Sequence, residues 1–377
     1  MTTTKNNEHK KLNVPNLRFP KFQGEWEKCK LGDYGKVVTG NTPPTKDIEN
    51  YENGTYLWAS PADLGTIKSI TETKTMLSAQ GFSKTRTLPK GSVLVTCIGS
   101  TIGKAGMATK EMSTNQQINS IVVNDNNDNE FVYYAIQSAF PRYLSSIAVQ
   151  AVPIISKSAF ELLPNNRPYL QEQKKIGKFL SMLDERIATQ NKIIDKLQSL
   201  IKGVAQKIVH SNKPNVRLSE CLECKSSTLQ ESEVCEQGTY PVYGANGIVG
   251  YLDNYNTEGE AVYIIKDGSG VGTVFYVTGK CSATGTLNTL QAKEGYSLHY
   301  LYYLLKVFNF EPYKTGMAIP HIYFKDYGKA KVFCPSYTEQ LQYARLLSAI
   351  DTKLLIEQNI LTKLSLQKQY LLRLMFI

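Results

Sequence analysis

Residues 176–208 read IGKFLSMLDERIATQNKIIDKLQSLIKGVAQKI, and this stretch decides much of the fold. Apolar residues recur at alternating spacings of four and three from Ile176 to Ile208, interrupted by one polar residue, Gln190. A strict repeat of about 3.5 residues predicts a long helix that packs along another helix. The alternative is an ordinary amphipathic helix packed on its own domain, which usually shows a wider apolar stripe over fewer turns. The seam positions are 176, 180, 183, 187, 190, 194, 197, 201, 204 and 208.

The same seam returns near the C-terminus, with Glu357 in the place of Gln190. The repeat extends beyond the helices, which indicates a tandem duplication whose second copy is shorter by roughly 18 residues. The second seam occupies 343, 347, 350, 354, 357, 361, 364, 368, 371 and 375. The other matched segments are Gln150-Ala151-Val152-Pro153 with Met317-Ala318-Ile319-Pro320, Glu172-Gln173 with Glu339-Gln340, Asp184 with Asp351, Phe131-Val132-Tyr133-Tyr134 with Leu298-His299-Tyr300-Leu301, Ser100 and Gly103 with Ser269 and Gly272, and Lys30-Leu31-Gly32-Asp33 with Arg217-Leu218-Ser219-Glu220.

Each copy follows one plan, in which a β-rich region precedes a short helix and then the long helix. Because the second copy begins soon after the first long helix, the two long helices should run antiparallel. Each should be roughly 57 Å long at about 1.5 Å per residue, with a globular head at either end of the pair. The predicted strands are Ser92–Cys97, Ile118–Val123, Ala261–Ile265 and Thr273–Val277, and the short helices lie near Glu130–Ala139 and Leu298–Val307. The fold class is therefore α+β, with the long helices forming an antiparallel coiled coil.

Composition favours two folded domains with a polyanionic partner. The 377 residues are 42% hydrophobic and carry a net charge of +10, which suits nucleic acid or an anionic membrane. There is no run of about 18 apolar residues and no apolar segment after the lysine-rich N-terminus, so we expect neither a membrane span nor a secretory signal. Seven scattered cysteines read as reduced thiols of a cytoplasmic protein.

Two similar but unequal basic heads at a fixed separation suit an asymmetric, two-part DNA site. Neighbouring major-groove stretches on one face of a duplex lie about 34–36 Å apart, within the reach of such a pair. The divergence between the copies predicts that the two heads read different sequences. A palindromic target is therefore not expected.

Several segments resemble one known family, and together they cover essentially the whole chain. They are similar to the specificity subunit of type I restriction-modification systems. The chain departs from the family at Asn165-Asn166-Arg167-Pro168, where a Pro-Pro turn is usual, and at Ala148, where the second copy has Gly316. The segments are Val14-Pro15-Asn16-Leu17-Arg18-Phe19-Pro20-Lys21-Phe22, Trp26, Leu31-Gly32-Asp33, 153–184, 316–351, Tyr240-Pro241-Val242-Tyr243-Gly244, Gly247-Ile248 and Gly250-Tyr251.

The resemblance implies two target-recognition domains that each read half of a split site in double-stranded DNA. It also implies spacer helices that dock two methyltransferase subunits and, through them, motor-nuclease subunits. S-adenosylmethionine, ATP and Mg²⁺ are then expected on those partners, with no cofactor, catalytic residue or metal on this chain. The predicted divisions are 1–22 as an N-terminal tail, 23–165 as target-recognition domain 1, 166–212 as spacer helix 1, 213–334 as target-recognition domain 2 and 335–377 as spacer helix 2.

Motifs that resemble catalytic sites are each better explained by structure. Asn41-Thr42-Pro43-Pro44 has the wrong order for the loop of an amino-methyltransferase, so we expect a turn. Gly99-Ser100-Thr101-Ile102-Gly103-Lys104 is one residue short of a phosphate-binding loop, and Gly268-Ser269-Gly270-Val271-Gly272 lacks a strand–loop–helix context. Both are expected to be turns between strands, which either present polar groups to DNA or are purely structural.

Two motifs leave a metal site open as a minor alternative. Asp63 with Glu72 and Lys74 mimics a nuclease triad without independent support. Cys221 and Cys224 with Cys235 have a zinc-like spacing but lack a fourth ligand, so buried thiols are favoured.

Base contacts require polar side chains on loops or strand edges, and phosphate contacts require lysine or arginine. The candidates in the first copy are Lys46, Trp58, Ser60, Lys84, Arg86, Ser100, Thr101, Lys104, Gln116 and Gln117. Those in the second copy are Tyr243, Asn246, Lys266, Ser269, Thr284, Lys314 and His321.

Two other functions remain as alternatives. One is a coiled-coil scaffold whose two heads bind protein or glycan, which salt-independent binding would indicate. The other is a free-standing methyltransferase or nuclease, which activity of the chain alone would indicate. The target bases, the spacer length and the subunits of the assembled complex are not readable from the sequence.

Overall fold

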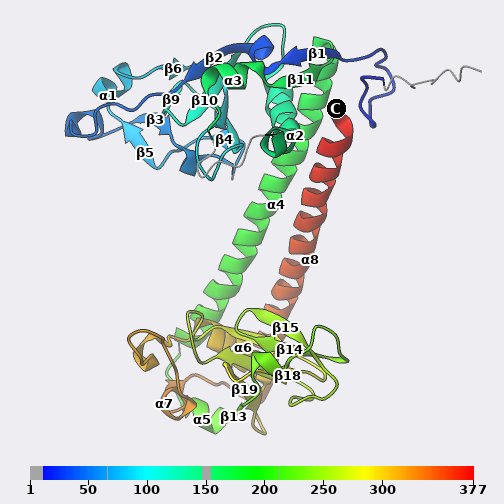
Figure 1. The fold of residues 1–377 in the computed structure, drawn as a ribbon. Coiled ribbons are helices and arrows are strands. Elements are labelled where there is room, and N and C mark those ends of the chain that lie inside the picture. Colours follow the sequence, from blue (N-terminus) through cyan, green and yellow to red (C-terminus); the bar gives the residue numbers. More distant parts are fainter. Residues whose placement is uncertain (1–11, 66, 147–153, 211) are drawn as a thin grey trace, which may run out of the picture. The chain divides into compact units, whose positions relative to one another are not determined.

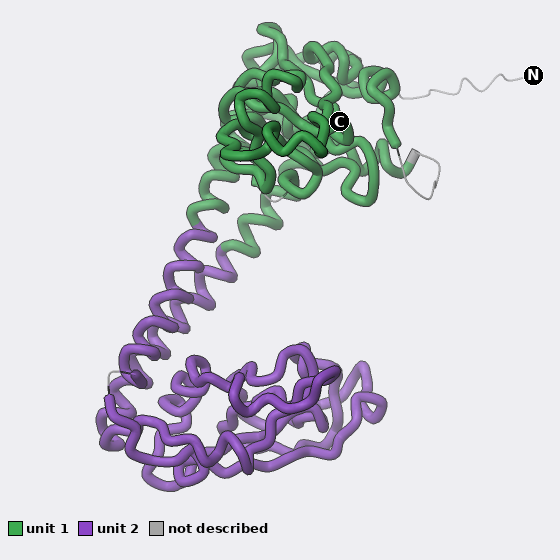
Figure 2. Tube along the Cα trace, turned by 90° about the vertical axis from the view of Figure 1, so that its left-hand side faces the viewer, with its two compact units in different colours: residues 1–189, 361–377 green, residues 190–360 purple. Residues whose placement is uncertain are grey.

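The computed structural model describes residues 12–65, 67–146, 154–210 and 212–377, which form two compact units (Figures 1 and 2). Unit 1 comprises 1–189 and 361–377, and unit 2 comprises 190–360. Each unit therefore contains one globular head together with a segment of each long helix. The matched segment Gln150-Ala151-Val152-Pro153 lies outside the described residues.

The head of unit 1 is built on two sheets with the strand orders β2-β10-β7-β8-β4 and β5-β3-β9-β6. Helix α2 packs on strands of the first sheet, and a small β1–β11 pair closes the head. The strands are β1 Glu27–Lys30, β2 Gly35–Thr39, β3 Tyr56–Ala59, β4 Ser69–Ile70, β5 Thr75–Leu77, β6 Thr87–Leu88, β7 Val93–Thr96, β8 Ala105–Ala108, β9 Met112–Thr114, β10 Ile118–Val123 and β11 Pro164–Arg167. The helices are η1 Leu31–Tyr34, η2 Ile48–Asn50, η3 Pro61–Asp63, α1 Ala79–Ser83, α2 Asn129–Ser146, α3 Lys157–Leu162 and α4 Leu170–His210.

The head of unit 2 repeats this plan with the strand orders β13-β19-β16-β17 and β15-β14-β18. The parallel contact of β3 with β9 recurs as β14 with β18, and the pair β1–β11 recurs as β12–β20. The strands are β12 Val216–Arg217, β13 Leu222–Ser226, β14 Tyr240–Gly244, β15 Gly247–Leu252, β16 Ala261–Ile265, β17 Val274–Val277, β18 Ser282–Ala283, β19 Leu287–Ala292 and β20 Lys331–Val332. The helices are α5 Leu218–Cys221, η4 Glu231–Glu233, α6 Leu298–Val307, η5 Glu311–Tyr313, α7 Phe324–Tyr327 and α8 Tyr337–Met375.

Hydrogen bonds at the start of each head confirm the repeat. The backbone N–H of Lys30 donates to the Asp33 carboxylate at 2.7 Å, and that of Arg217 donates to Glu220 at 2.9 Å. The N–H groups of the next residues, Leu31 and Leu218, donate to carbonyls that lie 167 residues apart, in Leu163 and Ala330. The duplication therefore preserves backbone geometry in spite of low sequence identity.

The predicted match of Phe131–Tyr134 with Leu298–Leu301 is wrong by two residues. Asp128 N–H donates to the Gln173 side chain at 3.0 Å, and Ser297 N–H donates to Gln340 at 2.9 Å. These bonds place Asp128 opposite Ser297, and both residues cap the helix that follows. The change in spacing therefore lies after the short helix and not before it.

Segments of α4 and α8 pack together in each unit, and the burial follows the predicted seams. Every position of both seams is buried or half-buried. In unit 1, Lys368 contacts Asp184 at 2.6 Å, and in unit 2 the Gln190 amide donates to the Glu357 carbonyl at 3.0 Å and to its carboxylate. The two polar positions predicted to interrupt the seams are therefore partners of one another.

The predicted division points differ from the observed helix ends. Helix α4 begins at Leu170 and not at 166, because β11 pairs with β1 through Arg167. Helix α8 begins at Tyr337 and not at 335. The described part of the predicted tail packs on unit 1, where Arg18 makes an ion pair with the buried Glu172 at 2.7 Å.

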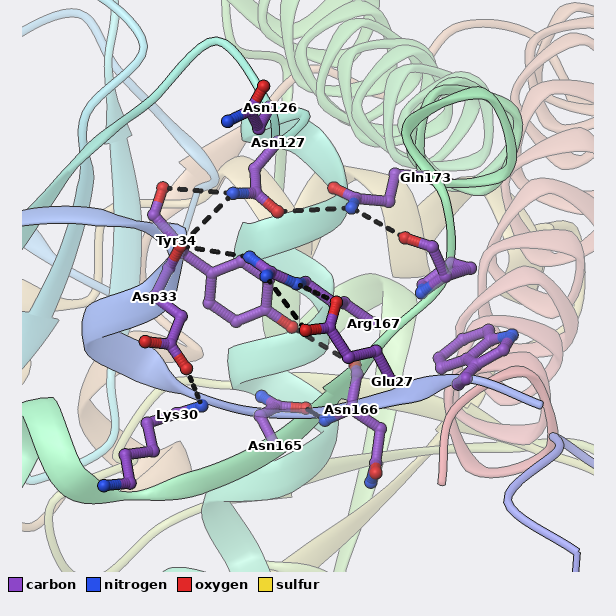
Figure 3. A network of polar contacts seen from close by, with 12 residues as sticks. Glu27, Lys30, Asp33, Tyr34, Asn126, Asn127, Asn165, Asn166, Arg167 and Gln173 are labelled. Carbon is purple, nitrogen blue, oxygen red and sulfur yellow. Dashed lines mark hydrogen bonds and ion pairs between the residues drawn. The ribbon is translucent and has the colours of Figure 1, made fainter.

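A polar network fastens the first head to the start of α4 (Figure 3). The buried Gln173 side chain donates to Asn127 at 3.2 Å and to the Pro168 carbonyl at 2.9 Å. Arg167 donates to the Asp33 carbonyl at 3.1 Å and pairs with Glu27. Because a buried amide is costly unless its hydrogen bonds are made, this network fixes the direction in which the chain enters α4.

Candidate nucleic-acid interface

Loops from four parts of the sequence meet at one edge of the first head. The Asn41 amide donates to the Lys84 carbonyl at 2.9 Å and accepts the Arg86 N–H at 2.9 Å. The Thr42 hydroxyl donates to the Gln116 side chain. These contacts hold three loops together and leave their tips facing solvent.

The fourth loop is the turn between β7 and β8. Cys97 N–H donates to the Gln117 carbonyl at 2.7 Å, which joins this turn to the loop before β10. Gly99 and Gly103 have φ values of +93° and +90°, which residues with a side chain rarely adopt. We call the joined loops rim 1, which comprises residues 41–46, 84–86, 98–104 and 115–117.

The second head carries an equivalent edge. Lys266 N–H donates to the Thr286 carbonyl at 3.0 Å, in the place of the bond between Cys97 and Gln117. Gly285 N–H donates to the Leu229 carbonyl at 2.7 Å. Gly268 N–H donates to the Pro320 carbonyl at 3.0 Å, which adds the segment before α7. We call these loops rim 2, which comprises residues 227–229, 266–272, 284–286 and 314–322.

The two glycine-containing motifs are turns between strands, as predicted. Ile102 N–H donates to the Gly99 carbonyl at 3.2 Å, and Val271 N–H donates to Gly268 at the same distance. In each turn the last glycine, Gly103 or Gly272, donates its N–H at 2.9 Å to a carbonyl of the preceding strand. One backbone design therefore presents different side chains in the two rims.

Most of the predicted DNA-contacting residues lie on the rims. In rim 1, Lys46, Lys84, Arg86, Ser100, Lys104 and Gln116 are exposed, whereas Thr101 and Gln117 are half-buried. In rim 2, Ser269 is exposed, whereas Lys266, Lys314 and His321 are half-buried.

Besides Trp58, three predicted residues lie away from the rim loops as defined. The Ser60 hydroxyl donates to Asp63 at 2.8 Å and stabilises the start of η3. Asn246 is exposed on the turn between β14 and β15, and Tyr243 packs its ring near Tyr263 inside the head. Burial raises the pKa of Tyr243, so its hydroxyl stays protonated and neutral.

Trp58 and Thr284 are wrong as exposed DNA contacts because both are buried. Trp58 is 9% exposed and its indole N–H donates to the Asn41 carbonyl at 3.1 Å. Thr284 is 1% exposed, and its hydroxyl lies 2.9 Å from that of Thr286. Trp58 therefore supports rim 1 from beneath, and Thr284 is a buried part of rim 2.

Several basic side chains of the rims already lie beside acidic partners. Lys84 pairs with Asp47 at 3.6 Å, Lys314 with Glu311 at 2.6 Å, and His321 lies 2.6 Å from Asp267. Within the ranges described, Lys46, Arg86 and Lys104 have no carboxylate within 4 Å. Arg86 is also oriented, since its guanidinium donates to the Thr39 carbonyl at 2.8 Å. These three cations are the best placed for phosphate.

Charge is divided unequally between the units. Unit 1 contains 26 lysines and arginines against 17 acidic residues, a net charge of +9. Unit 2 contains 17 against 16, a net charge of +1. An anionic partner is therefore attracted mainly by unit 1.

The residues of the metal alternatives have structural contacts. Asp63 accepts the Lys74 N–H at 2.8 Å in addition to the Ser60 hydroxyl. The Cys221 sulfur lies 3.8 Å from that of Cys334, and this contact together with burial raises the pKa of Cys334. In the part of the chain that the structure describes, no group of three His, Cys, Asp or Glu residues is arranged to hold a metal ion. None of its helices is long and apolar enough to cross a membrane.

Asn41 and Thr42 join the loops of rim 1, and neither is among the residues predicted from the sequence to contact DNA. In the sequence Asn41 belongs only to a broken methyltransferase motif, whereas in the structure its amide joins the loop at 41–46 to the loop at 84–86. The Asn-Thr-Pro-Pro string is a loop signal, but its partners come from distant parts of the sequence.

Comparison with known proteins matches the model of the type I restriction modification DNA specificity domain to residues 23–199 and again to 211–366. The MjaIX specificity subunit of Methanocaldococcus jannaschii is 30% identical over 186 residues, which cover 47% of this chain and 43% of that protein. The HindI specificity subunit of Haemophilus influenzae is 28% identical over 186 residues, covering 47% and 40%. The matched stretch thus spans less than half of these relatives.

Solved structures show the same fold. The type I restriction-modification S subunit from M. genitalium superposes with a TM-score of 0.68 at 20% identity, covering 97% of this chain and 99% of that one. A chain from a structure of a type I restriction-modification assembly gives a TM-score of 0.55 at 17% identity, covering 93% and 97%.

Proposed function

Because the chain belongs to the family of type I restriction-modification DNA specificity domains, we propose that it reads a two-part, asymmetric sequence in double-stranded DNA. Rim 1 contacts one half of the site and rim 2 contacts the other. The observation that carries this proposal is the duplicated rim, in which one backbone framework presents different side chains. Different side chains on one framework select different bases, so the two half-sites differ.

The chain acts as the non-catalytic subunit of its complex. Helices α4 and α8 form an antiparallel coiled coil that sets the spacing between the half-sites and docks two methyltransferase subunits. Motor-nuclease subunits join through these partners, which bind S-adenosylmethionine, ATP and Mg²⁺. The complex works in the cytoplasm, where its DNA is found. The family match covers the two domain copies, and we propose this assembly for the chain as a whole.

The test is methylation by the chain assembled with its methyltransferase subunits. Genomic DNA is mapped for methylated adenines with the gene present, absent, and present with residues 1–150 replaced by those of a relative. We expect one asymmetric two-part motif that disappears with the gene, and the replacement should change only one half. A change in both halves would refute the assignment of one half-site to each head.

DNA binding by the same complex gives a second test. Log affinity should fall steeply with log salt concentration because lysine and arginine displace counterions from phosphates. Salt-independent binding would favour the scaffold function instead.

A further inference from the structure

Unit 2 has a polar groove of about 480 Å³ that is lined in part by residues 227–229 of rim 2. Its walls come from the end of β13, the loop after it, and the segment that follows β15. The lining residues used below are Lys225, Thr228, Glu233, Asn254 and Tyr255. None of these was predicted from the sequence to contact DNA.

One wall of the groove corresponds to rim 1. The Thr39 hydroxyl donates to the Asn119 side chain at 2.6 Å in unit 1, and the Ser226 hydroxyl donates to Asn288 at 2.7 Å in unit 2. These matched pairs place Thr39 and Ser226 at the same point of the two heads. The loop that follows Ser226 therefore takes the place of the loop that carries Asn41.

The opposite wall corresponds to rim 1 as well. Leu88 pairs with Met112 in unit 1, and Thr257 pairs with Cys281 in unit 2, at equivalent points of the repeat. The residues just before Leu88 include Arg86, and those just before Thr257 are Asn254, Tyr255 and Asn256. The groove therefore occupies the position in the second head that corresponds, in the first head, to the junction of the loops 41–46 and 84–86.

The groove is held open by hydrogen bonds within its walls. The Asn256 amide donates to the Ser227 hydroxyl at 3.1 Å and to the Ala283 carbonyl at 3.0 Å, and it accepts the Ala283 N–H at 3.0 Å. The Tyr255 ring lies 4.6 Å from the Lys280 ammonium and packs edge-on to Tyr240. A ligand would therefore meet walls that are already ordered.

Two polar side chains of the groove are available for a ligand. Asn254 and Thr228 are both exposed, and within the described ranges neither side chain has a hydrogen-bond partner. The Asn254 amide can donate and accept hydrogen bonds, and so can the Thr228 hydroxyl. Together they offer uncharged hydrogen-bonding groups at the mouth of an ordered groove.

Charge argues against a phosphate in the groove. Glu233 contributes a carboxylate to the lining, and the ammonium of Lys225 is bonded to Gln291 at 3.3 Å. Unit 2 as a whole has a net charge of only +1. Phosphate binding relies on surplus positive charge, whereas base edges can also be read by uncharged amide and hydroxyl groups and by carboxylates.

We propose that this groove reads base edges for the second half-site, with Asn254 and Thr228 as specificity-determining residues. The inference rests on the proposed function and names the surface that the second head uses. Asparagine suits adenine, to which its amide can make two hydrogen bonds. Thr228 accepts or donates to a neighbouring base, and Glu233 can accept from a cytosine amino group.

The test uses the chain assembled with its methyltransferase subunits and duplex DNA that carries the mapped motif. Asn254→Ala and Thr228→Val are compared with Gln237→Ala, which removes another exposed amide of unit 2 outside the groove. We expect Asn254→Ala to weaken binding to the motif by roughly tenfold. It should relax methylation at one position of one half-site and leave the salt slope unchanged.

The outcomes separate this inference from the proposed function. If the unmodified complex shows no sequence preference, the proposed function fails. If it does show one and Asn254→Ala and Thr228→Val alter neither affinity nor preference, the groove assignment is overturned. A reduced salt slope with unchanged preference would also overturn it, because that pattern belongs to a phosphate contact. Hydrogen exchange of each variant, unchanged in β14 and β16, verifies that the head stays folded.

Discussion

Replacing Gln173 by alanine should destabilise the first head more than the equivalent replacement of Gln340 destabilises the second. The Gln173 side chain, 1% exposed, makes three hydrogen bonds, to Asp128, Asn127 and Pro168, and Figure 3 shows the bond to Asn127. Gln340, 2% exposed, makes two, to Ser297 and Pro335. The two substitutions therefore compare the same site with different numbers of bonds.

At about 1 kcal/mol for each buried hydrogen bond, Gln173→Ala should cost about 3 kcal/mol and Gln340→Ala about 2 kcal/mol. The assay is denaturant unfolding of the full chain, with hydrogen exchange measured separately in α2 and α6. Gln173→Ala should speed exchange in the first turn of α2, because its bond to the Asp128 N–H orders that turn. Gln340→Ala should act on α6 in the same way.

The matched control is Gln198→Ala on an exposed face of α4, which should change stability by less than about 0.5 kcal/mol. An equal or larger loss for Gln340→Ala would refute the bond-by-bond reasoning. Faster exchange in α6 on substitution of Gln173 would refute the assignment of each glutamine to its own head.

Three further outcomes follow from individual contacts. Gly103→Ala should destabilise by about 1–3 kcal/mol in thermal unfolding, and more than Gly272→Ala, because the added Cβ would lie 2.6 Å from Phe140 whereas the nearest atom at Gly272 is at 3.0 Å; equal losses would contradict this. Arg86→Ala should weaken binding to all duplexes and lower the salt slope by about 1, with a preserved motif in methylation mapping; a changed motif would instead make it a base contact. Hydrogen bonds from Lys353 and then Gln190 lower the pKa of Glu357, so the stability that its carboxylate contributes is present at neutral pH and is lost as the pH falls below about 4.5. In Glu357→Gln the free energy of unfolding should therefore fall less steeply between neutral and acidic pH than in the unmodified protein. An unchanged pH dependence would contradict the assignment.

Local patterns predicted the regular elements well because each depends on neighbouring residues. The strands Ile118–Val123 and Ala261–Ile265 have the predicted bounds, since both are β-branched runs buried within a sheet. The seam of the long helices follows from their spacing alone. The helix α2 runs past the predicted end at Ala139 through Pro141 to Ser146, beyond what the apolar pattern indicated.

Long-range contacts explain what the sequence did not predict. The short helices are rich in aromatic residues, so two registers of the repeat match nearly as well, and only the bonds to Gln173 and Gln340 decide between them. Tryptophan is a residue type that often contacts a ligand at a surface, but Trp58 lies in strand β3 and is buried. Asn254 lies next to the deletion in the second copy, where alignment with the first copy gave no guide.

The two unequal heads share one fold because backbone hydrogen bonds maintain the framework while the side chains on it differ. Backbone groups alone join the glycine-containing turn of each rim to a neighbouring loop, through Cys97 with Gln117 in rim 1 and Lys266 with Thr286 in rim 2. Because these bonds do not depend on side-chain identity, rim residues can change without disturbing the strands beneath them. Under the proposed function, we therefore expect unit 1, with its surplus of +9, to supply most of the salt-dependent attraction and the nearly neutral unit 2 to contribute mainly discrimination among sequences. It follows that exchanging rim residues within unit 2 should alter the motif far more than the overall affinity for DNA.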